Sequence, residues 1–135
     1  PLNARRRGNG GMTPLSTAVF HGKMPIVKYL IERRDARVSY HNRDGNSPLH
    51  LAAFLGRTEM VKYLLEKGAS VTKKNDRDDT PVDTVSSEWS AGLAKFYNSL
   101  NEGANFGLDL AEVKRARPEI ATLLKAHAAK SKDQR

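Results

Sequence analysis

Apolar residues recur at helical spacing in two stretches of closely related sequence. "GKMPIVKYLIER" begins at Gly22, and "GRTEMVKYLLEK" begins at Gly56. An apolar face at this spacing predicts an amphipathic helix in each stretch. The apolar positions are Ile26, Val27, Leu30 and Ile31 in the first, and Met60, Val61, Leu64 and Leu65 in the second.

A shorter segment with a proline near its start precedes each of these helices. It reads "TPLSTAVFHG" from Thr13 and "SPLHLAAFLG" from Ser47, and a third copy, "TPVDTVSSEW", starts at Thr80. Thr or Ser can cap a helix N-terminus, and proline suits the first helical position, where an N–H group has no partner in the helix. Each segment therefore predicts a short helix that packs against the longer one.

The prolines of the three short segments define a repeat. Pro14, Pro48 and Pro81 are 34 and 33 residues apart, and a period of this length is typical of a solenoid of stacked units. Polar, turn-forming stretches between the units predict projecting loops. We call these residues 5–12, 41–46 and 74–79 the first, second and third finger loops.

The second unit resembles an ankyrin repeat. "DGNSPLHLAAFLGRTEMVKYLLEKGAS", from Asp44 to Ser70, carries the Pro-Leu-His-x-Ala core of the repeat signature, and the resemblance covers residues 2–86. It implies an all-α ankyrin-repeat solenoid of helix–turn–helix units with hairpin-like loops. The first unit departs at Ser16 and the third at Asp83, where the family has His, and Asp78 replaces a turn glycine. We expect Asp78 to adopt the left-handed conformation that Asp tolerates.

An insertion interrupts the third unit. Twelve positions separate Pro14 from Ile26 and Pro48 from Met60, whereas the matching segment of the third unit, "RPEIATLLKAH", places Ile120 39 positions after Pro81. About 27 residues are therefore inserted, at a closure cost of about 1 kcal/mol. We expect one domain over residues 1–135, with repeats at about 11–43, 44–76 and 77–129 and a helical insertion at about 87–115.

The sequence of the insertion predicts two helices. The first predicted helix carries an aromatic face; Ser87 could cap this helix and Gly103 could end it. The second runs from Asp109 to Ala116, and Pro118 closes it. Such a face either caps the C-terminal end or convex back of the last repeat, as solenoids require, or forms a docking surface around Trp89 and Tyr97. The aromatic face comprises Trp89, Leu93, Phe96, Tyr97 and Leu100.

The resemblance also implies where a partner binds, because ankyrin-like proteins use their loop tips and the concave face of their first helices. Phe20 and Phe54 are equivalent positions that either form the centre of a binding groove or pack against neighbouring loops. The concave residues are Thr17, Phe20 and His21 in the first unit, Leu51, Phe54 and Leu55 in the second, and Thr84, Ser87 and Glu88 in the third. The tips add Arg5, Arg6, Arg7, Met12, His41, Arg43, Lys74 and Arg77.

The charge distribution bears on the partner. The net charge is +8, and residues 1–40 hold eight Lys or Arg against two acids, whereas residues 41–86 are balanced. An excess of positive charge attracts acidic partners over long range, so we expect an acidic or mixed-charge protein segment. The alternatives are a nucleic acid or anionic polymer bound by the basic first finger loop, and a structural role within a longer repeat array.

Candidate catalytic and metal-binding residues are few. The chain has no cysteine, and His50 belongs to the repeat signature, where it is expected to hydrogen-bond neighbouring loops. The acidic third finger loop lacks the glycine and the bidentate Glu of a calcium loop. We therefore expect no cofactor, no metal and no catalysis; an enzyme whose pocket the insertion roofs is the remaining alternative.

The start of the chain, "PLNARRR", is similar to the segments that close the first and second units. We therefore expect an upstream repeat or a neighbouring chain to cover the apolar N-terminal face of the first unit. No apolar run is long enough to span a bilayer. We expect a soluble protein with the cytoplasm as the favoured compartment, from which an upstream targeting signal could have been removed.

Overall fold

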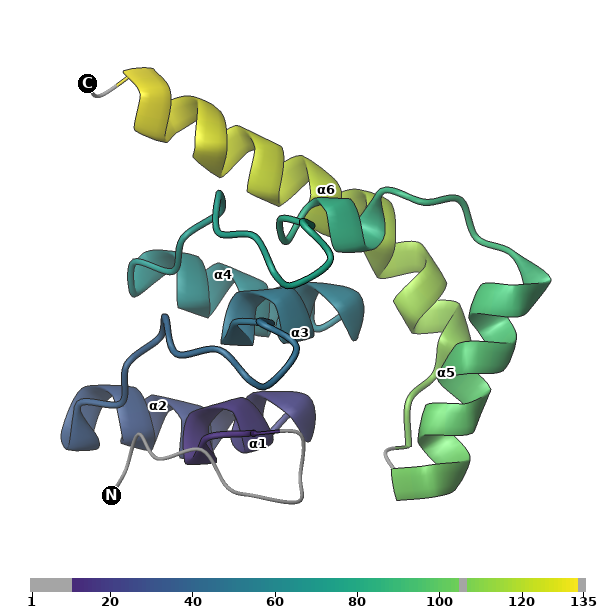
Figure 1. Cartoon of the computed structure of the whole chain (residues 1–135), viewed down its shortest axis with the longest axis horizontal. Helices are drawn as coiled ribbons and strands as arrows, with labels where there is room; N and C mark the ends of the chain where they lie inside the picture. Colours follow the sequence, from purple (N-terminus) through teal and green to yellow (C-terminus); the bar gives the residue numbers. More distant parts are fainter. Residues whose placement is uncertain (1–10, 105–106, 134–135) are drawn as a thin grey trace.

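The computed structural model describes residues 11–104 and 107–133, and this part of the chain is helical without strands. Figure 1 shows the arrangement. The elements are α1 (Pro14–Phe20), α2 (Met24–Arg34), α3 (Pro48–Phe54), α4 (Thr58–Glu66), the 3-10 helix η1 (Asp83–Val85), α5 (Ala91–Ala104) and α6 (Leu110–Asp133).

The helices form three stacked layers. The pair α1 and α2 makes the first, α3 and α4 the second, and η1 with α6 the third, so that α1 packs on α3 and α4 packs on α6 (Figure 1). The core runs continuously through the layers and is built mainly from the apolar faces that the sequence predicted, with Val27, Leu64 and Ile120 fully buried. Ile26 of the predicted face of α2 is the exception and is exposed. This arrangement confirms the expected all-α solenoid.

Local sequence explains the first two layers. The Thr13 and Ser47 hydroxyls accept hydrogen bonds from the N–H groups of Ser16 and His50, at 3.1 Å and 3.3 Å, and a proline occupies the next position. The two predicted caps are therefore confirmed. Asp78 adopts the expected left-handed conformation, with φ of 67°.

The prediction that Thr80 caps a helix in the third unit was wrong. Only one 3-10 turn forms there, and the carboxylate of Asp83 accepts hydrogen bonds from the N–H and the hydroxyl of Thr80, at 2.9 Å and 3.0 Å. Ser47 makes both bonds of such a pair, because its hydroxyl accepts the N–H of His50 and its own N–H donates to the His50 ring. At Thr80 the side chain three residues later is still the acceptor, but the Thr80 hydroxyl donates to it and caps no helix N–H. The β-branched Val82, Thr84 and Val85 further disfavour a longer helix.

The prediction that Pro118 ends a short helix was also wrong, because α6 is continuous through it. Proline costs a helix the hydrogen bond from its own nitrogen to the carbonyl four residues earlier, here that of Lys114. Both residues are exposed to solvent, while Ala116 and Ile120 on either side are buried. Burial on both sides holds the helix together across the break in its hydrogen bonding.

The insertion helix α5 differs from the prediction in its cap, its end and its position. Ser90 rather than Ser87 caps it, by accepting the N–H of Leu93 at 3.1 Å, and it runs past Gly103 to Ala104. It lies to one side of the stack, beside α6 (Figure 1), and its aromatic residues contact Phe54 at the end of α3. The expectation that it caps the C-terminal end or the convex back of the stack was therefore wrong.

Gly56 allows α6 to approach the second layer. Its φ is 71°, and a Cβ at this position would lie 3.0 Å from the Cα of Val113. A side chain would therefore be strained and would also push the start of α6 away. None of the helices in the described residues is long and apolar enough to cross a membrane.

Candidate protein-binding surface

Two asparagines fix the second and third finger loops. The side-chain oxygen of Asn42 accepts the N–H groups of Asp44 and Asn46, both at 3.0 Å, and Asn75 does the same 33 positions later. The loops are also joined to each other, because the N–H of Asp76 donates to the carbonyl of Asp44 at 3.0 Å. The second and third finger loops are thus held in one conformation by their own hydrogen bonds.

His50 joins the second layer to the third finger loop. Its Nδ1 accepts the N–H of Ser47 at 3.2 Å, so its Nε2 carries the proton and donates to the Asp79 carbonyl at 2.9 Å. Burial lowers the pKa of His50, and nearby Lys73 acts in the same direction, against the opposing effect of the Asp79 hydrogen bond. His50 therefore makes the hydrogen bond to a neighbouring loop that the resemblance implied, and its lowered pKa favours the neutral imidazole.

A hollow of about 550 Å³ lies between these loops and the first helices, and we call it the concave groove. Its floor is α3 and η1, one side is formed by the finger loops, and Phe96 of α5 contributes from the insertion. The lining residues are Asp44, Asn46, His50, Leu51, Phe54, Asn75, Asp76, Arg77, Asp79, Asp83, Thr84, Ser87 and Phe96.

The concave residues of the second unit have different environments. Leu51 and Leu55 are buried, whereas Phe54 is half-buried. Leu51 lines the concave groove, but Leu55 lines a different hollow, described below. The ring of Phe54 stacks on Tyr97 at 4.9 Å between centroids and meets the edge of Phe96 at 5.7 Å. Phe54 therefore joins the insertion to the groove.

The concave residues of the first and third units lie outside the aromatic cluster of Phe54, Phe96 and Tyr97. Phe20 is half-buried against the core and makes an edge contact with the ring of His21, which is exposed. Thr84 and Ser87 line the groove, and Glu88 is exposed beyond them.

Tyr97 is the anchor of the insertion. Its side chain is fully buried, its ring stacks on Trp89 as well as on Phe54, and its hydroxyl donates a hydrogen bond to the Phe54 carbonyl. Burial raises the pKa of Tyr97, although the neighbouring Arg117 opposes this shift. Phe96, the next residue, remains 51% exposed. The insertion thus buries one aromatic residue and presents the other to the groove.

Arg117 joins the insertion to the third layer, and the sequence analysis missed it. Its buried guanidinium donates to the carbonyls of Thr84 and Ser87, at 3.4 Å and 3.0 Å, to the Ser87 hydroxyl at 3.0 Å and to the Tyr97 hydroxyl at 3.2 Å. A signal was present, because Arg57 occupies the equivalent position in the second unit and donates to the Phe20 carbonyl at 3.0 Å.

The basic residues of the loop tips differ in how available they are to a partner. Lys74 pairs with Asp78 at 3.6 Å, while Arg77 lines the concave groove and Arg43 is exposed. The predicted tip residues Arg5, Arg6 and Arg7 lie outside the described residues.

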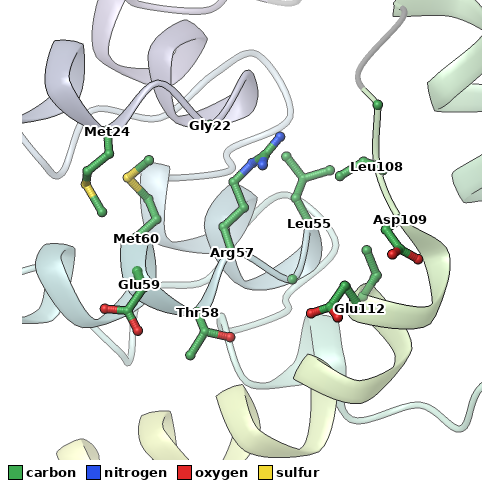
Figure 2. Close-up of a pocket in the computed structure, with 13 residues that line it drawn as sticks. Gly22, Met24, Leu55, Arg57, Thr58, Glu59, Met60, Leu108, Asp109 and Glu112 are labelled. Atoms are coloured by element: carbon green, nitrogen blue, oxygen red, sulfur yellow. The ribbon is translucent and has the colours of Figure 1, made fainter.

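A second hollow, of about 420 Å³, lies on another side of the stack (Figure 2). Met24 and Met60 line one part of it, and Glu59, Asp109 and Glu112 provide carboxylates. Arg57 lies among them, held by its hydrogen bond to Phe20. These carboxylates do not form a metal site, since no group of His, Asp and Glu in the described part of the chain is arranged to hold an ion.

Comparison with known families identifies the class of protein. The family model described as ankyrin repeats (3 copies) matches residues 2–75, which is more than half of the chain. The chain therefore belongs to the ankyrin-repeat family, whose members are generally protein–protein interaction modules rather than enzymes. No curated protein matches the chain.

Replacing Tyr97 by Phe tests the junction between the insertion and the stack. The variant keeps both ring stacks but leaves the Phe54 carbonyl and an Arg117 N–H without their partner, so we expect a loss of about 1–3 kcal/mol in the free energy of unfolding. Urea unfolding followed by the fluorescence of Trp89 gives the value. Tyr29→Phe, which removes an exposed hydroxyl, should change it by less than about 0.5 kcal/mol, and equal losses in the two variants would contradict the assignment.

His50 makes stability depend on pH in a definite window. The unfolded chain protonates this imidazole near its ordinary pKa of 6.5, whereas the folded chain does so only at lower pH. The free energy of unfolding should therefore decrease as the pH falls through 6.5 toward the lowered pKa. Urea titrations at pH 7.5 and 5.5 should show a smaller decrease in His50→Gln, and an equal decrease in both proteins would refute this role.

Proposed function

We propose that the chain is a non-catalytic interaction module that binds a segment of a partner protein in the concave groove, with the basic loop tips contributing at its rim. The observation that carries this proposal is the groove itself, whose walls come from the second and third finger loops, α3, η1 and the insertion. Its loops are held by internal hydrogen bonds, so little conformational entropy is lost on binding.

Phe96 is the residue we expect to contribute most to affinity. Half of its side chain is exposed at the groove, beside the half-buried Phe54 and the buried Tyr97, and aromatic residues in such positions are typical binding hot spots. The aromatic residues behind it hold its position, so a partner would meet a fixed ring.

A library of displayed random peptides, selected against the immobilised chain, tests this proposal. Enriched peptides should lose at least about tenfold in affinity for Phe96→Ala, since truncating a hot spot costs 2 kcal/mol or more. Lys125→Ala is the control, because Lys125 is exposed on α6, outside both the groove and the N-terminal face. Failure to enrich any peptide, or equal losses in the two variants, would overturn the proposal.

A second function, as part of a longer repeat array, is favoured by the N-terminal face of the first layer. Ile26 and Tyr29 are 51% and 52% exposed, whereas the equivalent Met60 and Tyr63 of the second layer are 3% and 9% exposed. Helix α2 covers Tyr63: the amino group of Lys28 in α2 lies 5.7 Å from the centroid of the Tyr63 ring. The first layer therefore presents the same kind of surface that α2 covers in the second.

Adding a repeat tests whether this face accepts one. We expect a copy of residues 44–76, fused directly before Gly10 in place of residues 1–9, to raise the urea midpoint and slow amide hydrogen exchange in α2, because neighbouring repeats stabilise each other. The same fusion with Ile26→Lys and Tyr29→Lys should lose the gain. A fusion that gives no stabilisation would argue against the array.

A further inference from the structure

The concave groove has a charge opposite to that of the whole chain. Four aspartates line it, against one cation, Arg77, and the lowered pKa of His50 keeps that imidazole neutral. None of these four aspartates pairs with a Lys or Arg among the described residues. The four aspartates and Arg77 leave the lining with a net charge of −3 (1 − 4), although Lys73 and Lys74 act on His50 and Asp83 from just outside the lining. The chain as a whole carries +8, so the lining of the groove is opposite in sign to the molecule. The four are Asp44, Asp76, Asp79 and Asp83.

The aromatic part of the groove favours the same kind of ligand. Phe54 and Phe96 line the hollow together with the carboxylates, and the face of an aromatic ring attracts a cation. A guanidinium group can lie flat on such a ring and also form paired hydrogen bonds with a carboxylate, whereas an ammonium group acts as a point charge. Rings and carboxylates in one hollow therefore suit arginine best.

We propose that the concave groove binds a basic protein segment, with arginine side chains as the specificity-determining contacts. This inference rests on the proposed function, since it names the chemistry of the segment bound in the same groove. The carboxylates also disfavour a phosphate backbone at this position, because like charges repel.

The groove and the net charge of the chain favour ligands of opposite charge. A chain of net charge +8 attracts acidic segments from a distance, and salt screens that attraction within about 8 Å at physiological ionic strength. A groove lined by carboxylates selects basic segments at contact. The two effects predict opposite preferences, so a single comparison of peptides distinguishes them.

The test uses four fluorescein-labelled peptides of the same length that differ at four positions, which carry Arg, Lys, Gln or Glu. Fluorescence anisotropy with the full chain at physiological salt gives the dissociation constants. We expect the Arg peptide to bind most tightly, the Lys peptide next, and the Gln and Glu peptides at least tenfold more weakly than the Arg peptide.

Matched variants locate the effect in the groove. Asp44→Asn with Asp76→Asn removes two negative charges whose side chains make no hydrogen bond within the described residues, and should weaken the Arg peptide at least tenfold. Glu66→Gln with Glu119→Gln removes the same charge from exposed positions on α4 and α6, outside the groove, and should leave its affinity unchanged.

The outcomes distinguish the preference for a basic segment from the proposed function as a protein-binding module. Tighter binding of the Glu peptide, equal weakening in both double variants, or no detectable binding of the Arg peptide would overturn the preference for a basic segment. In each case the proposed function stands if displayed peptides are still enriched and still depend on Phe96. It fails when no displayed peptide is enriched.

Discussion

The buried guanidinium of Arg117 holds the third layer and the insertion together. It donates to the backbone carbonyls of Thr84 in η1 and of Ser87 just after it, and to the hydroxyl of Tyr97, which in turn donates to the Phe54 carbonyl at the end of α3. A buried charge is costly unless its donors are satisfied, and here carbonyl and hydroxyl oxygens take this role. Because these partners come from three segments far apart in sequence, the bonds can form together only when the insertion is folded against the stack.

The insertion is tolerated because it replaces a contact that the regular repeat provides. In the second layer, Arg57 donates to the Phe20 carbonyl of the layer before it. In the third, the equivalent Arg117 reaches the corresponding Phe54 carbonyl through the Tyr97 hydroxyl. The carbonyl at the end of each short helix therefore has a donor in both layers. The small entropic cost of a longer loop is then offset by the burial of Tyr97.

The fold could be predicted where the same sequence signal repeats from unit to unit. The prediction failed where a single residue changes which local structure is favoured. The spacing of the prolines and of the apolar positions predicted α1 to α4 and the burial of Ile120. Asp83 in place of a histidine takes the Thr80 hydroxyl as a hydrogen-bond donor, so this hydroxyl caps no helix, and burial around Pro118 overrode the proline. The continuity of α6 through Pro118 depends on contacts made after the layers have stacked. The Thr80–Asp83 bonds are local, between residues three apart, and the prediction from Thr80 alone did not include Asp83.

The candidate site was less predictable, since it depends on which of several exposed positions the insertion covers. Sequence spacing placed Phe20 and Phe54 in equivalent positions, yet the insertion packs on Phe54, so the two differ in environment. The total charge was likewise a poor guide to local chemistry. It sums the basic residues 1–40 with a neutral middle region, whereas the folding of two finger loops and η1 gathers four aspartates from that region into one groove. Partner preference at contact is set by the residues that the fold brings together, and long-range charge affects mainly the rate of encounter.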